Sequence, residues 1–109
     1  LTLLNLGNTL VEQGEYLNAI QYYQQAISLD AQSPILLRNL ACAYRKAGMI
    51  QKAGETLDRI PFEEIDSPEI WMERAIYLVQ IKQYNQAEEI LQVLTQSEKQ
   101  RAHAYFQLA

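Results

Sequence analysis

The residue types that most often carry catalysis are sparse in this chain. His103 is the only histidine and Cys42 the only cysteine, and they are not near one another in the sequence. A nucleophile needs a base within hydrogen-bond reach, and no Ser–His or Cys–His arrangement is indicated. The adjacent glutamates at 63–64 and 88–89 are interpreted as solvated charge, because neighbours on a helix point away from one another. We therefore predict no enzymatic activity, no cofactor and no metal site in these residues.

Composition narrows the choice of partners. The 109 residues are 49% hydrophobic and 20% charged, as in a folded globular chain. The formal net charge of −4 argues against nucleic acids and anionic membrane surfaces as partners. No apolar run approaches the roughly 18 residues that span a bilayer, and one cysteine cannot form an internal disulfide. Because the chain begins at Leu1 rather than at methionine, we expect it to be a piece of a longer protein.

The elements that would position any binding residue come from an internal repeat. Shifting the sequence by about 34 residues aligns several registers without an insertion. One register is always large and apolar, and another is always very small. These two registers are Leu3, Leu37, Trp71 and Tyr105, and Gly7, Ala41, Ala75 and Ala109.

Each unit is predicted to fold as two antiparallel helices. In the second unit, apolar and small residues recur at steps of three and four, and Gly48 supplies a left-handed end for the first helix. Close packing is expected where both helices carry short side chains. The predicted contacts pair Gly7, Ala41 and Ala75 of the first helices with Ala19, Ala53 and Ala87 of the second helices.

Start and stop signals set the unit boundaries. Ser33 and Ser67 can N-cap helices, and each is followed by proline at the first helical position. Pro61 should end the second helix of the second unit early. Ser97 with Gln100 forms a capping-box pattern that predicts the start of a further helix. The predicted units are 1–33, 34–67, 68–101 and a partial fourth unit, 102–109.

Most tyrosines fall in repeat registers, so we interpret them as core residues rather than as a stacking platform for bases. The tyrosines predicted to be in the core are Tyr16, Tyr23, Tyr44, Tyr84 and Tyr105. The acidic connector 61–67 is interpreted as a variant turn held to the core by Phe62 and Ile65, with a recognition loop as the alternative.

The pattern resembles the tetratricopeptide repeat, a helix–turn–helix unit of about 34 residues. The resemblance covers nearly the whole chain and implies an all-α solenoid of antiparallel helix pairs that forms a right-handed superhelix. Three residues depart from the family pattern. Arg74 replaces the usual leucine, Lys82 replaces the usual turn glycine, and Pro61 falls inside a helix. We therefore expect the third unit to be less ideal than the first two.

The resemblance also implies a concave groove lined by the first helix of each pair. Arginine there would bind carboxylates, asparagine would bond to an extended backbone, and apolar residues would mark an interaction surface. The apolar residues could instead be covered by missing repeats, a capping helix or another copy of the chain. The residues predicted to line the groove are Leu4, Asn8, Arg38, Asn39, Cys42, Arg45, Met72, Ile76 and Val79.

One known site of this family is a clamp that grips the C-terminal carboxylate of heat-shock chaperones. Asn8 and Asn39 match the asparagines of that clamp. However, Leu4, Glu69 and Glu73 stand where the clamp has Lys, Lys and Arg. Two carboxylates would repel an acidic ligand, so we predict no binding to chaperone tails.

The predicted function is protein–protein interaction, in which the groove binds a peptide or helix of a partner protein. One alternative is a structural segment that self-associates through exposed terminal helices or stacks on further repeats. Another is a regulatory module of a larger enzyme or sensor. We expect no nucleic-acid partner, no membrane insertion and a cytoplasmic location.

Overall fold

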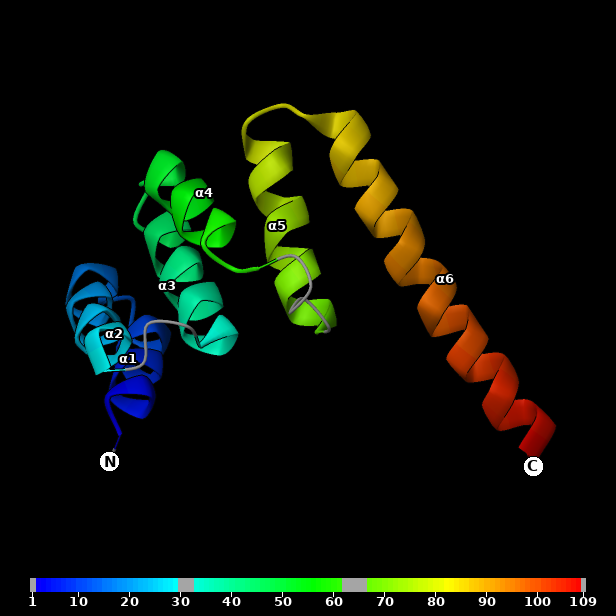
Figure 1. Cartoon of the computed structure of the whole chain (residues 1–109), viewed down its shortest axis with the longest axis horizontal. Helices are drawn as coiled ribbons and strands as arrows, with labels where there is room; N and C mark the ends of the chain where they lie inside the picture. Colours follow the sequence, from blue (N-terminus) through cyan, green and yellow to red (C-terminus); the bar gives the residue numbers. More distant parts are fainter. Residues whose placement is uncertain (1, 30–32, 62–66, 109) are drawn as a thin grey trace.

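The chain forms a row of antiparallel helix pairs (Figure 1). The computed structural model describes the backbone of residues 2–29, 33–61 and 67–108, and side chains as far as residue 96. These residues contain no strand, and each helix packs on the next one, which confirms the predicted all-α solenoid. The helices are α1 (Leu3–Glu12), α2 (Tyr16–Leu29), α3 (Pro34–Lys46), α4 (Ile50–Asp58), α5 (Pro68–Gln80) and α6 (Tyr84–Leu108).

Helix starts follow the capping residues of the sequence. The Thr2 hydroxyl accepts a hydrogen bond from the Asn5 amide at 3.1 Å, and the Ser33 hydroxyl accepts one from the Leu36 amide at 3.3 Å. Each bond satisfies one of the amide donors that a helix start leaves free. Ser67 occupies the predicted N-cap position of α5, but its hydroxyl donates to the Glu69 carboxylate instead of capping the backbone.

The turns inside the three helix pairs share one left-handed conformation. Gly14 and Gly48 have φ of 81° and 85°, as predicted for Gly48. Lys82 has φ of 66° at the equivalent place, although it carries a side chain. The Gln83 amide donates to the Leu78 carbonyl at 2.8 Å, and the Met49 amide donates to the Tyr44 carbonyl at the same distance. The third turn therefore keeps the backbone geometry without the glycine that favours it.

Small residues let the paired helices approach closely. Gly7 is buried, and a Cβ atom built on it would overlap the ring of Tyr23. Gly54 is buried in the same way beneath the ring of Tyr77, which joins α4 to α5. The alanines of the predicted close contacts are almost completely buried, in agreement with the prediction. They are Ala19, Ala41, Ala53, Ala75 and Ala87.

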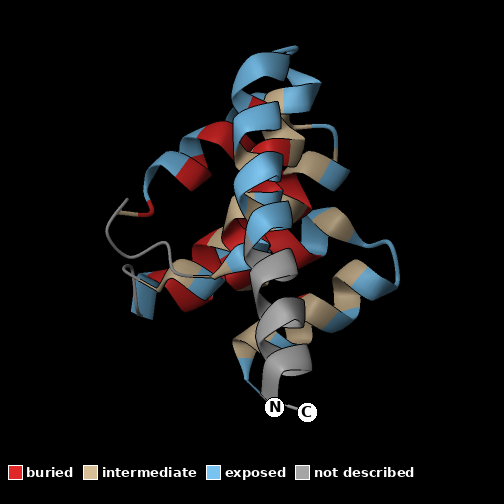
Figure 2. Ribbon diagram, turned by 90° about the vertical axis from the view of Figure 1, so that its right-hand side faces the viewer, coloured by how far each residue is buried: buried red, intermediate tan, exposed pale blue. Residues whose placement is uncertain are grey.

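The core lies mainly between α2, α3 and α4, where Tyr23, Leu37 and Leu57 are the largest fully buried side chains. Figure 2 shows the buried residues gathered between the helices, whereas the described part of α6 is mostly exposed. The prediction that Tyr84 belongs to the core is wrong, because its side chain is 59% exposed. Tyr84 begins α6 directly after the third turn, and no later helix pair in the described residues covers it.

Helix α4 ends early, as Pro61 predicted. It has 9 residues, whereas its counterpart α2 has 14. Arg74 compensates for the lost turn, because its Nη2 donates to the Leu57 carbonyl at 3.3 Å and lies 3.5 Å from the Asp58 carboxylate. A cation at a helix C-terminus satisfies free carbonyls and complements the helix dipole. Arg74 thus replaces the usual leucine at the point where the shortened helix needs a donor.

The C-terminal end differs from the sequence prediction. Helix α6 runs unbroken over 25 residues, antiparallel to α5, and its C-terminal part extends beyond the start of α5 (Figure 1). The predicted helix start at Ser97 is therefore wrong. Ser33 and Ser67 are each followed by proline, whereas Glu98 follows Ser97 and favours continuation of the helix. The side chains of 97–109 and the connector residues 62–66, including Phe62 and Ile65, lie outside the described side chains. The unit boundaries stay a prediction.

Replacing Lys82 with glycine should stabilise the fold. The left-handed conformation costs a residue with a side chain about 1–2 kcal/mol. Glycine avoids this cost, but part of the gain is lost because glycine gives the unfolded chain more conformational entropy. We expect Lys82→Gly to raise the free energy of unfolding by about 0.5–1 kcal/mol in urea denaturation.

The matched control is Gly48→Lys, which places lysine at the same turn of the second unit and should destabilise the fold by a similar amount. A lower unfolding midpoint for Lys82→Gly than for the unsubstituted chain would contradict the assignment of this turn.

Candidate functional site

The first helices of the three pairs form one continuous face, because α1 contacts α3 and α3 contacts α5. A hollow of about 270 Å³ opens on this face between α1 and α3. We call it the polar hollow. It brings together four of the predicted groove residues, Asn8, Arg38, Asn39 and Cys42. Its full lining is Asn8, Val11, Glu12, Tyr23, Arg38, Asn39 and Cys42.

A hydrogen-bond network orients Asn8 at the floor of the polar hollow. The Tyr23 hydroxyl donates to Oδ1 of Asn8 at 2.5 Å, and Nδ2 of Asn39 donates to the same oxygen at 3.3 Å. Both bonds engage the Asn8 oxygen, so the amide nitrogen of Asn8 is left without a partner among the described residues. That nitrogen carries two N–H donors, which are available to a ligand.

Tyr23 is 1% exposed, and burial raises the pKa of its hydroxyl to about 12. The positive charge of Arg38 lowers this pKa by a smaller amount. The phenol therefore stays protonated at neutral pH and remains a donor to Asn8. The sequence interpretation assigned Tyr23 only to the core, and nothing in its register signals this second role.

Arg45 is held by a nearly buried ion pair. Its Nε donates to Oε1 of Glu73 at 2.6 Å and its Nη2 donates to Oε2 at 3.4 Å. Hydrogen bonding to Glu73 raises the pKa of Arg45, and Glu73 is only 5% exposed. Nη2 also lies 3.5 Å from Sγ of Cys42, which lines the polar hollow. Arg45 thus joins α3 to α5 with its charge already neutralised.

Arg38 differs from Arg45 although both lie on the same helix. It is half-buried in the wall of the polar hollow. Among the described residues it has no ion pair and no hydrogen bond from its guanidinium. Arg38 is therefore the cation of the hollow that can accept a ligand carboxylate. Glu12, on the facing wall, is exposed.

The predicted apolar residues of the third unit lie on α5. Met72 is 42% exposed and Val79 is 44% exposed, while Ile76 is half-buried between them. We call these three residues the apolar stripe. Glu73, beside Met72 on the helix, reaches Arg45, so the ion pair lies between the polar hollow and the apolar stripe. Leu4, in contrast, does not line the polar hollow. It lines a separate depression with Leu36.

The comparisons with known proteins identify the family and support the fold. A family model described as "Tetratricopeptide repeat" matches residues 10–76. The chain belongs to the tetratricopeptide repeat family. The match begins in the last turn of α1 and ends within α5, and it includes all of α2, α3 and α4.

Among curated proteins, this tetratricopeptide repeat chain is similar to the heat-shock protein cognate co-chaperone sgt12 of Aspergillus fumigatus. The two are 30% identical over 83 residues, which is 76% of this chain and 24% of the co-chaperone. The chain thus spans about a quarter of the length of that relative.

Solved tetratricopeptide repeat domains share the fold. The Sgt2 domain from Aspergillus fumigatus has a TM-score of 0.79 and 28% identity, over 89% of this chain and 64% of that one. The second domain of Spaghetti (RPAP3), bound to the HSP90 peptide SRMEEVD, has a TM-score of 0.77 and 20% identity, over 85% of this chain and 86% of that one. At 20% identity the second likeness shows the fold alone.

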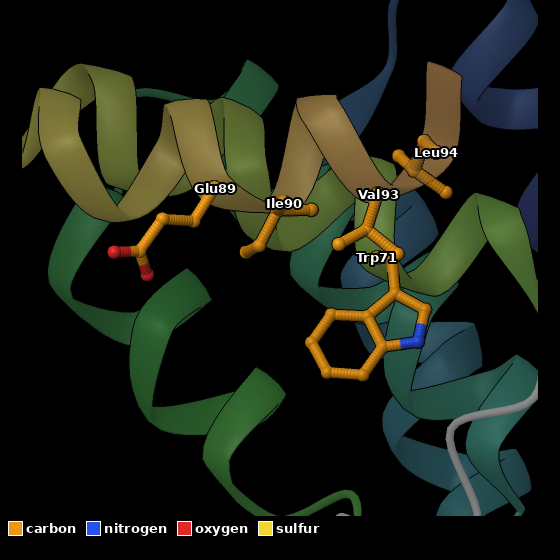
Figure 3. Close-up of a pocket in the computed structure, with 5 residues that line it drawn as sticks. All are labelled: Trp71, Glu89, Ile90, Val93 and Leu94. Atoms are coloured by element: carbon orange, nitrogen blue, oxygen red, sulfur yellow. The ribbon is translucent and has the colours of Figure 1, made fainter. Parts of the chain in front are cut away.

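One cleft, between α5 and α6, was not predicted from the sequence. It has a volume of about 200 Å³ and is lined by Trp71, Glu89, Ile90, Val93 and Leu94. Figure 3 shows the Trp71 ring beside Val93, with Ile90 and Leu94 on the same helix. Val93 is 63% exposed and lies outside the repeat registers. The early stop of α4 at Pro61 is the sequence signal that could have indicated reduced coverage of this region.

The described part of the chain shows neither a metal-binding cluster nor a membrane-spanning helix. It contains no group of three or more histidine, cysteine or acidic side chains placed to bind a metal ion. Within the same ranges, no helix has both the length and the apolar character needed to cross a bilayer.

The raised pKa of Tyr23 predicts a pH dependence of stability. In the unfolded chain the phenol loses its proton near 10.0, whereas the folded state holds it to about 12. Stability from this group is therefore complete below pH 10.0 and falls as the pH rises toward 12. Urea denaturation across this window should show a smaller loss for Tyr23→Phe than for the unsubstituted chain.

Tyr22→Phe is the matched control, because Tyr22 is the neighbouring, less buried tyrosine on α2 and its hydroxyl makes no hydrogen bond among the described residues. Equal alkaline losses for Tyr23→Phe and the unsubstituted chain would contradict the assignment.

Proposed function

We propose that this tetratricopeptide repeat segment binds a peptide or helix of a partner protein on the face formed by α1, α3 and α5. The observation that carries the proposal is the set of unused donors in the polar hollow. Arg38 and the amide nitrogen of Asn8 have no protein partner among the described residues. Polar groups in such a hollow bind and orient a ligand, while nearby apolar side chains supply contact area.

The relatives support a peptide-binding role. The similar protein sgt12 is a co-chaperone, and the RPAP3 domains of the same fold are bound to HSP90 and HSP70 peptides. Those ligands belong to those proteins. For this chain we use only the shape of the fold: the face built from the first helices can accept an extended peptide.

The ligand should differ from an acidic chaperone tail. Leu4 lies away from the polar hollow, and Glu69 accepts a hydrogen bond from Ser67. Glu73 neutralises Arg45. Arg38 is then the one cation of the polar hollow, which is fewer than a carboxylate clamp requires.

Charge reversal at the polar hollow combined with a polar substitution in the apolar stripe should abolish binding. We expect Arg38→Glu with Met72→Asp to lose partner capture from a lysate of the source cell, because it removes the free cation and an exposed contact residue. Circular dichroism should show unchanged helicity, since both side chains are partly exposed.

The matched control is Arg59→Glu with Val93→Asp, which makes the same chemical changes at exposed residues outside the proposed face. Retained capture by the Arg38 and Met72 variant would refute the site assignment.

An acidic chaperone tail peptide should not bind measurably at micromolar concentrations. Glu69 and Glu73 present carboxylates where a clamp needs cations, and the remaining attraction of Arg38 is screened by salt. Isothermal titration calorimetry with a peptide such as SRMEEVD is the measurement. A clear micromolar titration would show that the acidic residues do not set selectivity.

A further inference from the structure

We infer that the groove selects internal peptide segments that carry one acidic side chain, and that the Arg45–Glu73 ion pair excludes acidic C-terminal residues. This inference rests on the proposed function and specifies its ligand. It assigns to Glu73 a role in specificity, through its hold on Arg45.

Arg45 cannot bind a ligand carboxylate while Glu73 occupies its guanidinium. Both oxygens of Glu73 are engaged, at 2.6 Å from Nε and 3.4 Å from Nη2. A ligand carboxylate approaching Arg45 would meet the Glu73 charge at the same guanidinium. Glu73 is 5% exposed, so it cannot turn into solvent without leaving the half-buried Arg45 guanidinium unpaired.

The polar hollow is lined by one residue of each charge. Arg38 contributes one positive charge and Glu12 contributes one negative charge on the facing wall. One ligand carboxylate can therefore pair with Arg38, but a second nearby carboxylate would be repelled by Glu12. An acidic C-terminal residue carries two carboxylates, its side chain and its terminus. An internal acidic residue carries one, which matches the hollow.

The rest of the ligand can contact Asn8 and the apolar stripe. The free Asn8 donors can bind a main-chain carbonyl, which every internal segment offers. Beyond the ion pair, Met72 and Val79 are exposed and can contact apolar side chains. Neighbouring helices lie about 8–10 Å apart and an extended chain advances about 3.3 Å per residue. In the ligand peptide, apolar residues are therefore expected about two to four residues from the acidic residue.

Two peptides of equal composition test the inference by fluorescence anisotropy. The internal peptide is acetylated and amidated, with one glutamate and leucines two and four residues after it. The tail peptide carries the same residues but ends in that glutamate with a free carboxylate. The chain should bind the internal peptide at least about tenfold more tightly, a difference of the size that one charge-assisted bond supplies.

Two variants test whether the Arg45–Glu73 ion pair causes the weaker binding of the tail peptide. Glu73→Gln frees the Arg45 charge and should tighten binding of the tail peptide by about tenfold. Adding Arg45→Gln to that variant should abolish the gain, and circular dichroism should show that each variant stays helical. If Glu73→Gln does not fold, the preference of the unsubstituted chain between the two peptides decides the question.

Three results would overturn the inference. These are equal binding of the two peptides, no binding of the internal peptide, or no gain by a folded Glu73→Gln variant. The proposed function fails separately, if partner capture is insensitive to Arg38→Glu with Met72→Asp. A captured partner that binds only through its free C-terminus would reject the inference and leave the proposed function standing.

Discussion

The ion pair between Arg45 and Glu73 connects the architecture of this chain to its surface chemistry. It joins α3 to α5 with a distance of 2.6 Å and is nearly buried. A buried pair adds little net stability compared with apolar packing, but removal of one partner costs about 3–5 kcal/mol. The pair therefore fixes how the third unit sits on the second. It also determines which cation the groove presents, because Arg45 is neutralised and Arg38 is not.

The two junctions between repeats are built differently. The first unit packs on the second through the apolar core of α2 and α3, which includes Ile20, Tyr23 and Leu37. The second unit meets the third through less extensive contacts, since α4 ends at Asp58. Here the contact of Gly54 with Tyr77 and the bonds of Arg74 supplement the ion pair. Specific polar contacts thus replace part of an apolar interface.

Local signals in the sequence predicted much of this fold. The period of about 34 residues predicted the helix pairs, and Gly48 and Pro61 predicted a turn and an early stop that the structure contains. The errors occurred where a local signal was weak or where packing decided the outcome. Without a following proline, Ser97 does not begin a helix, and α6 continues through it. Tyr84 has the right register, but no later helix pair in the described residues covers it.

The candidate site was only partly predictable for a similar reason. The resemblance to tetratricopeptide repeats placed Asn8, Arg38, Asn39 and Cys42 on one face, and the structure brings them together. Spacing could not show that Arg45 pairs with Glu73, because the two are 28 residues apart and their contact depends on how α5 packs. For the same reason it could not show that the Tyr23 hydroxyl orients Asn8. Which side chains remain free for a ligand is a tertiary property.

Side-chain nuclear magnetic resonance of the complex with a captured partner tests the central claim most directly. The claim is that the partner lies on the face of α1, α3 and α5. We expect shifts of the Asn8 amide resonances and of the Met72 and Ile76 methyl resonances. Resonances of Ile90 and Val93, in the cleft between α5 and α6, should stay in place. Shifts confined to Ile90 and Val93 would contradict the account and place the partner on the cleft instead.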